Sequence, residues 1–224
     1  MSERVYARQF HAADGAEAWR VLPEGANAFF RTDSFVASAR FVEAISGLVR
    51  EGDEPHVDIR GDGVTVLLRA FKETGYGLLQ TDLDLARAVS TVAREMDLAP
   101  DPAAIQSLSV IPGATDRAGI MPFWQGVLGY DRRPDSPDED LVDPHGRLAP
   151  FWFEQLEELH ADGEGTIHLV VWVPWDEAES RVAAALAAGG RQVRHNAEHL
   201  FWTLADSAGN EVDIATTSAP DKTT

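Results

Sequence analysis

The sequence predicts an α+β fold in two regions, and three observations support this. Its 224 residues suffice for one large domain or two small ones, and 44% of them are hydrophobic. A strand–helix–strands order repeats in the C-terminal half, with an aromatic pair (Phe151-Trp152, Phe201-Trp202) on a late strand of each copy. Such a duplicated unit is typical of a cupped sheet that holds a small molecule. An aperiodic segment containing two prolines, 98–104, precedes the repeat and predicts a linker.

Composition excludes several classes of function. The formal net charge is −18, from 37 acidic against 19 basic residues, so we expect no nucleic-acid partner. No stretch approaches the ~20 apolar residues of a membrane span. Residues 1–10 also lack the apolar run of a signal peptide. The chain has no cysteine, which excludes disulfides and thiolate chemistry. We therefore expect a cytoplasmic protein with no membrane partner.

The N-terminal region, 1–97, predicts a sheet with two packed helices. The expected strands are 19–22, 28–32, 56–60 and 64–71, the last two joined by a Gly-Asp-Gly turn. Apolar residues at spacings of three and four predict one helix after the capping residue Ser34. A second helix is expected to follow Thr81 and Asp84, a pair that resembles an N-terminal cap.

The C-terminal region, 105–217, carries the repeat. Helices are expected at 117–128 and 175–188, and Asp176 near the start of the second helix suits a helix N-terminus. Residues 131–147 predict a polar, proline-rich loop, and residues 218–224 predict a flexible tail.

Two stretches of the N-terminal region resemble pterin carbinolamine dehydratase. They are "PHVDIR" (Pro55–Arg60) and "DLDLA" (Asp82–Ala86), within a strand–helix–hairpin–helix order that covers about Trp19–Glu95. The resemblance implies a lyase that removes water from 4a-hydroxytetrahydrobiopterin. It also implies two adjacent histidines before Pro55 and a third near Phe71, and this chain lacks all three.

Glu54 and His56 are the candidate catalytic residues of this region. Residues two apart on a strand face the same side, and a carboxylate beside a histidine suits proton transfer. The alternative is that both side chains are solvated at the start of a strand. Lys72 and Glu73 are expected to be surface charges.

The C-terminal region resembles the glyoxalase-like and bleomycin-resistance-like branch of the vicinal oxygen chelate superfamily. The stretches that carry the resemblance are "PFWQGVLGY" (Pro122–Tyr130), "TIHLVVWVP" (Thr166–Pro174) and "LADSAGNEVDIAT" (Leu204–Thr216). Together they cover about Ile105–Ala215. The resemblance implies a paired βαβββ domain, a small-molecule ligand and a homodimer.

Metal-dependent members of that superfamily take one ligand from each of four strands. The resemblance places candidate ligands at His168, Glu154 and Asp213, but the first strand, "IQSLSV" (Ile105–Val110), offers no histidine or acid. A divalent metal ion is therefore a candidate cofactor, and His168 is also a candidate catalytic residue. The alternative is that His168 is a hydrogen-bonded pocket histidine without metal.

Aromatic residues supply the candidate substrate-binding surface. Trp152, Trp172 and Trp202 are expected to line the hollow, because flat apolar walls suit a planar ligand. His199 lies in a loop that either closes over the hollow or is solvated.

Three functional hypotheses follow. The first is an enzyme performing lyase- or isomerase-type acid–base chemistry on a cyclic or oxygen-rich metabolite. The second is a non-catalytic protein that binds an aromatic natural product or drug. The third is a scaffold in which the N-terminal region mediates self-association.

Overall fold

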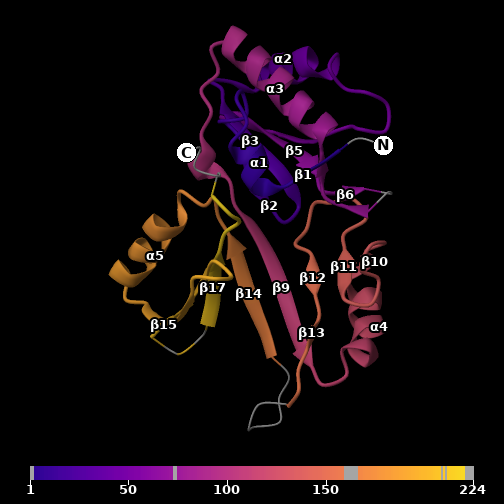
Figure 1. The fold of residues 1–224 in the computed structure, drawn as a ribbon, viewed down its shortest axis with the longest axis vertical. Helices are drawn as coiled ribbons and strands as arrows, with labels where there is room; N and C mark the ends of the chain where they lie inside the picture. The colour runs from indigo at the N-terminus through magenta and orange to yellow at the C-terminus, as the bar shows by residue number, and fades with distance from the viewer. Residues whose placement is uncertain (1–2, 73–74, 159–165, 208, 210, 220–224) are drawn as a thin grey trace. The chain divides into compact units, whose positions relative to one another are not determined.

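The computed structural model describes residues 3–72, 75–158, 166–207, 209 and 211–219 (Figure 1). The chain divides into two compact units of mixed α and β structure. Unit 1 comprises Met1–Gln106, Pro174–Glu177 and Thr216–Thr224, and unit 2 comprises Ser107–Val173 and Ala178–Ala215. The chain therefore leaves unit 1 and returns to it twice. No helix among the described residues is long and apolar enough to cross a membrane.

Unit 1 contains an antiparallel sheet with the order β2-β3-β5-β4. These strands are β2 (Arg20–Leu22), β3 (Gly25–Arg31), β4 (His56–Ile59) and β5 (Gly63–Arg69). Two short pairs join β1 (Arg4–Val5) to β8 (Leu78–Leu79) and β6 (Phe71–Lys72) to β7 (Gly75–Tyr76). The helices are α1 (Ala7–His11), α2 (Phe35–Ser46) and α3 (Gln80–Glu95), with a 3₁₀ turn η1 (Pro102–Ala104).

Near the start of each of the helices α2 and α3, a side-chain oxygen accepts a hydrogen bond from a free backbone amide. As expected, Ser34 caps α2, since its Oγ accepts a hydrogen bond from the Ala37 amide at 3.2 Å. The cap expected from Thr81 and Asp84 is wrong. Instead Asp82 Oδ2 accepts from the Leu79 amide at 2.7 Å, and α3 begins at Gln80. The carboxylate of Asp82, two positions before Asp84, therefore fills the role that the sequence assigned to Thr81 and Asp84.

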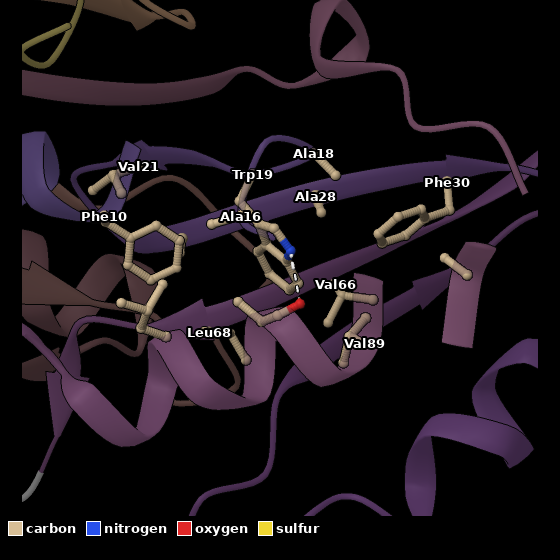
Figure 2. Packing of buried hydrophobic residues seen from close by; sticks show 14 of the residues in the cluster. Phe10, Ala16, Ala18, Trp19, Val21, Ala28, Phe30, Val66, Leu68 and Val89 are labelled. Atoms are coloured by element: carbon tan, nitrogen blue, oxygen red, sulfur yellow. Dashed lines mark hydrogen bonds between the residues drawn. The ribbon is translucent and has the colours of Figure 1, made fainter. Parts of the chain in front are cut away.

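Trp19 lies at the centre of the unit 1 core (Figure 2). The side chain is fully buried, and its Nε1 donates to Ser90 Oγ at 2.9 Å and to the Ala86 carbonyl at 3.2 Å, both on α3. Phe30 packs edge-on against Trp19 and also against Phe41 of α2. The indole therefore ties the sheet to both helices, and leaving its buried partners unpaired would destabilise the unit by about 1–3 kcal/mol.

The tight turn between β2 and β3 requires glycine at position 25. Gly25 has φ +145°, and a Cβ there would lie 1.9 Å from the Leu68 carbonyl oxygen. The close approach lets β3 pair with β5 from Gly25 onward. The hairpin is therefore tighter than the sequence predicts, since β3 begins at residue 25 and not at 28.

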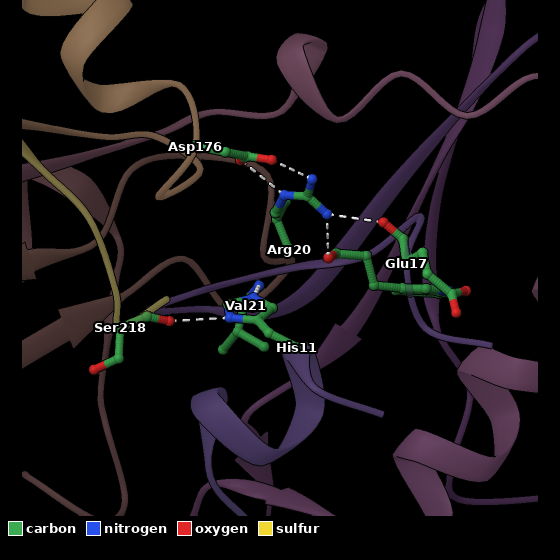
Figure 3. A network of polar contacts seen from close by, with 7 residues as sticks. His11, Glu17, Arg20, Val21, Asp176 and Ser218 are labelled. Atoms are coloured by element: carbon green, nitrogen blue, oxygen red, sulfur yellow. Dashed lines mark hydrogen bonds and ion pairs between the residues drawn. The ribbon is translucent and has the colours of Figure 1, made fainter. Parts of the chain in front are cut away.

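Two segments of unit 1 come from late in the sequence, and His11 and Arg20 bind them to the N-terminal part of the unit (Figure 3). His11 Nδ1 bonds the Ser218 carbonyl at 3.0 Å, and the Val21 amide donates to Nε2 at 2.9 Å. Arg20 holds Asp176 through two guanidinium nitrogens, one of them Nε at 2.9 Å. A pair of hydrogen bonds of this kind between arginine and a carboxylate is geometrically specific. We call these contacts the His11–Arg20 clamp.

The segments expected to be a linker and a tail are partly fixed. In 98–104, the Ala99 carbonyl accepts from the Arg31 amide at 2.8 Å, and the Asp101 amide donates to the Phe29 carbonyl at 2.9 Å. Of the tail 218–224, Ser218 is held by the His11–Arg20 clamp, and residues 220–224 lie outside the described residues.

Unit 2 contains one mixed sheet in which two βαβββ copies meet at β9 and β14. The strand order is β10-β11-β12-β9-β14-β17-β16-β15, and β13 also pairs with β9. The first copy comprises β9 (Ser107–Ala114), α4 (Arg117–Leu128), β10 (Asp131–Arg132), β11 (Asp140–Val142), β12 (Phe151–Trp152) and β13 (Glu154–Gln155). The second comprises β14 (Thr166–Trp172), α5 (Ala178–Ala187), β15 (Arg191–Asn196), β16 (Phe201–Ala205) and β17 (Glu211–Ala215).

Three local expectations for unit 2 need correction. The expected loop 131–147 contains β10 and β11, because Leu141 inserts into the core with no exposed surface. Helix α5 begins at Ala178, three residues later than expected, and Asp176 belongs to the His11–Arg20 clamp. Helix α4 has the expected bounds and ends at Gly129, which has φ +67°.

We predict that lowering the pH weakens unit 1 through His11. Burial, and secondly the charge of Arg20, lower the pKa of His11, although the Ser218 bond and Asp176 oppose this. The unfolded chain therefore takes up a proton near pH 6.5 that the folded chain resists. Stability from this group is complete above about pH 6.5 and falls below it, by at most about 1.4 kcal/mol per pH unit.

Urea unfolding of the wild type and His11→Gln between about pH 7.5 and 5.5 tests this prediction. The glutamine variant should lose stability less steeply over this range, whereas a His145→Gln control, at an exposed position, should follow the wild type. Identical slopes for all three proteins would contradict the assignment.

Candidate functional site

The sheet of unit 2 has one face packed against its helices and an opposite face that we call the open face. Residues of α4 and α5 join two core clusters with alternate strand residues such as Phe151 and Val171. The intervening residues point to the open face, because neighbours along a strand alternate. The open face presents Ser107, Ser109, Ile111, Trp152, Glu154, His168, Val170, Trp172, Phe201, Thr203, Asp213 and Ala215.

The three candidate metal ligands share the open face but not one site. His168 opposes Ile111 on β9, and Asp213 of β17 opposes Val170, one row further along. Glu154 lies beyond β9, in the row of Gly113. Within the described part of the chain, no three histidine, cysteine or acidic side chains lie close enough to hold a metal ion. The donor set therefore does not fit a three-ligand metal centre.

Asp213 has a hydrogen-bond partner within the protein. Thr203 Oγ1 of β16 donates to Asp213 Oδ1 at 2.6 Å, and the two residues are cross-strand neighbours. Thr203 is buried, so its hydroxyl depends on the carboxylate for its hydrogen bond. His168 is half-buried on the next strand. Thr203 and Asp213 therefore form a polar pair on the open face, with His168 one row away on the neighbouring strand.

Ser107 and Trp172 supply a feature that no sequence motif indicated. They are direct cross-strand partners on β9 and β14, so their side chains lie side by side. Ser107 Oγ and Trp172 Nε1 are both buried, and neither has a hydrogen-bond partner among the described residues. Because a buried polar atom without a partner costs about 1–3 kcal/mol, each such pair requires an explanation.

The other predicted substrate-binding residues are not brought together. Trp152 is on the open face and 40% exposed, whereas Trp202 joins the cluster on the α5 side and stacks on His195 at 4.7 Å. His199 is exposed in the turn before β16, where its amide donates to Asn196 Oδ1 at 3.0 Å. Trp202 and His199 therefore lie away from Ser107 and Trp172 in the sheet.

Unit 1 contains a pocket of about 590 Å³ that includes both of its candidate catalytic residues. Its charged and polar lining comes from the loop before β4, from β4 itself, and from β5, β6 and α3. The pocket is lined by Gly52, Asp53, Glu54, Pro55, His56, Leu68, Arg69, Phe71, Lys72, Leu79 and Asp82.

Glu54 and His56 differ in their surroundings. Both oxygens of exposed Glu54 accept from the Gly52 amide at 3.1 Å. Hydrogen bonds from its own backbone amide and, secondly, from the Gly52 amide lower the pKa of Glu54. His56 is half-buried, with Nε2 3.4 Å from Arg69 Nη1. Burial, and secondly the Arg69 charge, lower the pKa of His56. At neutral pH the pocket therefore holds an ionised carboxylate and a neutral imidazole, both of them proton acceptors.

Lys72 is not the surface charge that the sequence predicts. Its Nζ donates to Asp82 Oδ1 at 2.9 Å, and both side chains are largely buried. Glu73 lies outside the described residues. Sequence reasoning also missed Arg69, although the hairpin register offered a signal: His56 opposes Leu67, so Arg69, two residues on, shares its face.

We predict that the Thr203–Asp213 hydrogen bond stabilises unit 2. Thr203→Val keeps the shape but leaves the carboxylate without its donor, which should lower the free energy of unfolding by about 1.5–3 kcal/mol. Thr203→Ser retains the hydroxyl and serves as the matched control. Urea unfolding measures both, and equal losses in the two variants would contradict a role for the hydrogen bond.

Comparison with known protein families gives one match, to the family described as "Glyoxalase-like domain", over residues 109–215. No curated protein gives a significant match to the chain. Among solved structures, 18 chains match significantly.

Three of these structures illustrate the level of similarity. An NAD-dependent benzaldehyde dehydrogenase from Legionella pneumophila shares 13% identity (TM-score 0.38), with 50% of this chain and 99% of that one covered. A glyoxalase/bleomycin resistance protein/dioxygenase superfamily member from Vibrio splendidus 12B01 shares 15% (TM-score 0.32; 50% and 100% covered). A Mn(II)-bound glyoxalase from Novosphingobium aromaticivorans shares 12% (TM-score 0.32; 54% and 44% covered). Residues 109–215, which span the paired βαβββ sheet, form a glyoxalase-like domain.

Proposed function

We propose that this protein binds a small planar organic molecule on the open face of unit 2, with Ser107 and Trp172 as its hydrogen-bonding anchors. The observation that carries the proposal is the adjacent pair of buried polar atoms, Ser107 Oγ and Trp172 Nε1, without partners among the described residues. A ligand carbonyl or ring nitrogen that accepted from Trp172 Nε1 and bonded to Ser107 Oγ would satisfy both.

The neighbours of this pair suit a flat ligand. Trp172 and Phe201 pack with Ile111, Val170 and Ala215 in the apolar cluster of the open face. Aromatic walls with a few convergent polar groups are typical of small-molecule sites. The glyoxalase-like family match over residues 109–215 supports a small-molecule role for the same sheet.

His168 and Asp213 lie further along the same face and define the polar side of the site. The imidazole of a histidine can exchange a proton with a bound molecule, so the open face is compatible with chemistry as well as with binding. The proposal contains no metal-dependent step, because the His168, Glu154 and Asp213 donors do not gather into one group.

A second candidate function is acid–base chemistry on a cyclic metabolite in the unit 1 pocket, as the resemblance to pterin carbinolamine dehydratase implies. The observation that favours it is that Glu54 and His56 line one pocket. Loss of water requires one group to accept a proton and another to protonate the departing hydroxyl. Glu54 and His56 are both suited to accept a proton, and Lys72, which donates a hydrogen bond to Asp82, is the candidate donor.

We predict that Trp172→Phe weakens ligand binding to unit 2 about tenfold, the value of one hydrogen bond. Phenylalanine keeps an apolar ring but removes Nε1–H. Oxidised biopterin, whose pterin ring is planar and rich in acceptors, serves as the probe in isothermal titration calorimetry. Trp124→Phe, in helix α4 beside the core cluster on the helix side of the sheet, is the matched control and should bind as the wild type does. Equal affinities of Trp172→Phe and the wild type for a bound probe would refute the anchor.

The second candidate predicts turnover of 4a-hydroxytetrahydrobiopterin that His56→Gln reduces by about 10²-fold or more. Stopped-flow absorbance follows dehydration above the uncatalysed rate. His145→Gln changes an exposed histidine and should leave the rate unaltered. Absence of wild-type turnover would eliminate pterin dehydration as the function of unit 1.

A further inference from the structure

Arg69 brings a positive charge into the unit 1 pocket. The side chain is half-buried at the end of β5, and its recorded polar partner is His56 Nε2 at 3.4 Å. Among the described residues, no carboxylate lies within ion-pair distance of the Arg69 guanidinium. A neutral imidazole at this distance accepts at most one of the five N–H groups that a guanidinium carries.

The acidic residues of the pocket are already engaged or exposed. Asp82 accepts from Lys72 Nζ through one oxygen and from the Leu79 amide through the other. Glu54 turns both oxygens to the Gly52 amide. Asp53 is exposed at the rim, where water and salt screen its charge. The pocket therefore offers an anion a half-buried cation whose charge no inner carboxylate neutralises.

The rest of the lining is apolar and suits a ring. Leu79 and Pro55 line the pocket together with Phe71, whose ring packs on Tyr76 at 5.4 Å. A volume of about 590 Å³ falls within the range of small-molecule sites. A bare phosphate would leave these apolar walls without contacts, whereas a carboxylate attached to a ring would use both parts of the pocket.

We propose that the unit 1 pocket binds a small cyclic carboxylate, with the carboxylate on the Arg69 guanidinium and the ring against Pro55, Leu79 and Phe71. Arginine recognises a carboxylate through two parallel N–H bonds, and such charge-assisted bonds are among the strongest in proteins. His56 lies beside the bound group and donates to it when protonated. This site goes beyond the ligand site of unit 2, and it does not depend on pterin turnover.

Benzoate and its neutral counterpart benzamide test the proposal on the full-length protein. The wild type should bind benzoate in titration calorimetry and bind benzamide at least tenfold more weakly. Arg69→Gln should lower benzoate affinity by about 10- to 100-fold, as expected for loss of hydrogen bonds to a charged group. Arg60→Gln removes the same charge from an exposed arginine that pairs with Asp58, and it should bind benzoate as the wild type does.

Several outcomes would overturn the proposal. They are absence of benzoate binding at about 10 mM, equal binding of benzamide, and equal losses in Arg69→Gln and Arg60→Gln. Inorganic phosphate that competed fully with benzoate at equal concentration would show a general anion site and refute the ring requirement. Thermal unfolding of each variant distinguishes a lost site from a lost fold. The Trp172→Phe variant should bind benzoate normally, which separates this site from that of unit 2.

Discussion

The alternation of side chains along β14 is the constraint on which the organisation of unit 2 depends. This strand pairs with β9 on one side and with β17 on the other, so its residues set the register of both βαβββ copies. Val171 and Val173 face the α5 side, and His168, Val170 and Trp172 therefore face the opposite way. A shift of one residue would exchange the two faces and place His168 against a helix. The apolar packing of α5 thus holds the open face in place.

Unit 1 follows the same rule but uses it differently. Ala26, Ala28 and Phe30 of β3 and their β5 partners face the helices and Trp19. The opposite face of the sheet carries Leu67 and Arg69 of β5 beside His56 of β4. Small residues opposite large ones let the indole ring fit between the sheet and α3. The rigid core therefore fixes the hairpin that carries His56 and Arg69 to the edge of the pocket.

Sequence periodicity predicted the helices and main strands because their apolar faces are strong local signals. Helix α4 has its expected bounds, since its run is uncharged between Arg117 and Asp131. The strands β10 and β11 were missed because only Leu141 and a few neighbours are buried among polar residues. Asp176 was misassigned because its partner, Arg20, is distant in sequence. Lys72 was misassigned because its partner, Asp82, lies on another element.

The candidate sites were predictable only in part. Alternation places His168, Glu154 and Asp213 on one face, but their rows and strands, which sequence does not give, keep them apart. In the two aromatic pairs, different members face the open face. In the first copy it is the second residue, Trp152, whereas in the second copy it is the first residue, Phe201, and Trp202 packs on the helix side. No local signal distinguishes two adjacent aromatic residues. The Ser107–Trp172 pair depends on a contact between two residues more than 60 positions apart in the sequence, and no sequence motif indicates it.

The His11–Arg20 clamp has a consequence for how the chain is made. Ser218 and Asp176 complete hydrogen bonds of residues near the N-terminus, and Thr217 Oγ1 donates to the Val21 carbonyl at 2.7 Å. During synthesis, the first 106 residues therefore leave the ribosome long before Asp176 and Ser218, which complete the hydrogen bonds of unit 1, have been added to the chain. Until then His11 and Arg20 have only water in place of these partners. Although unit 1 begins before unit 2 in the sequence, its hydrogen bonding is completed only after the residues of unit 2 have been made.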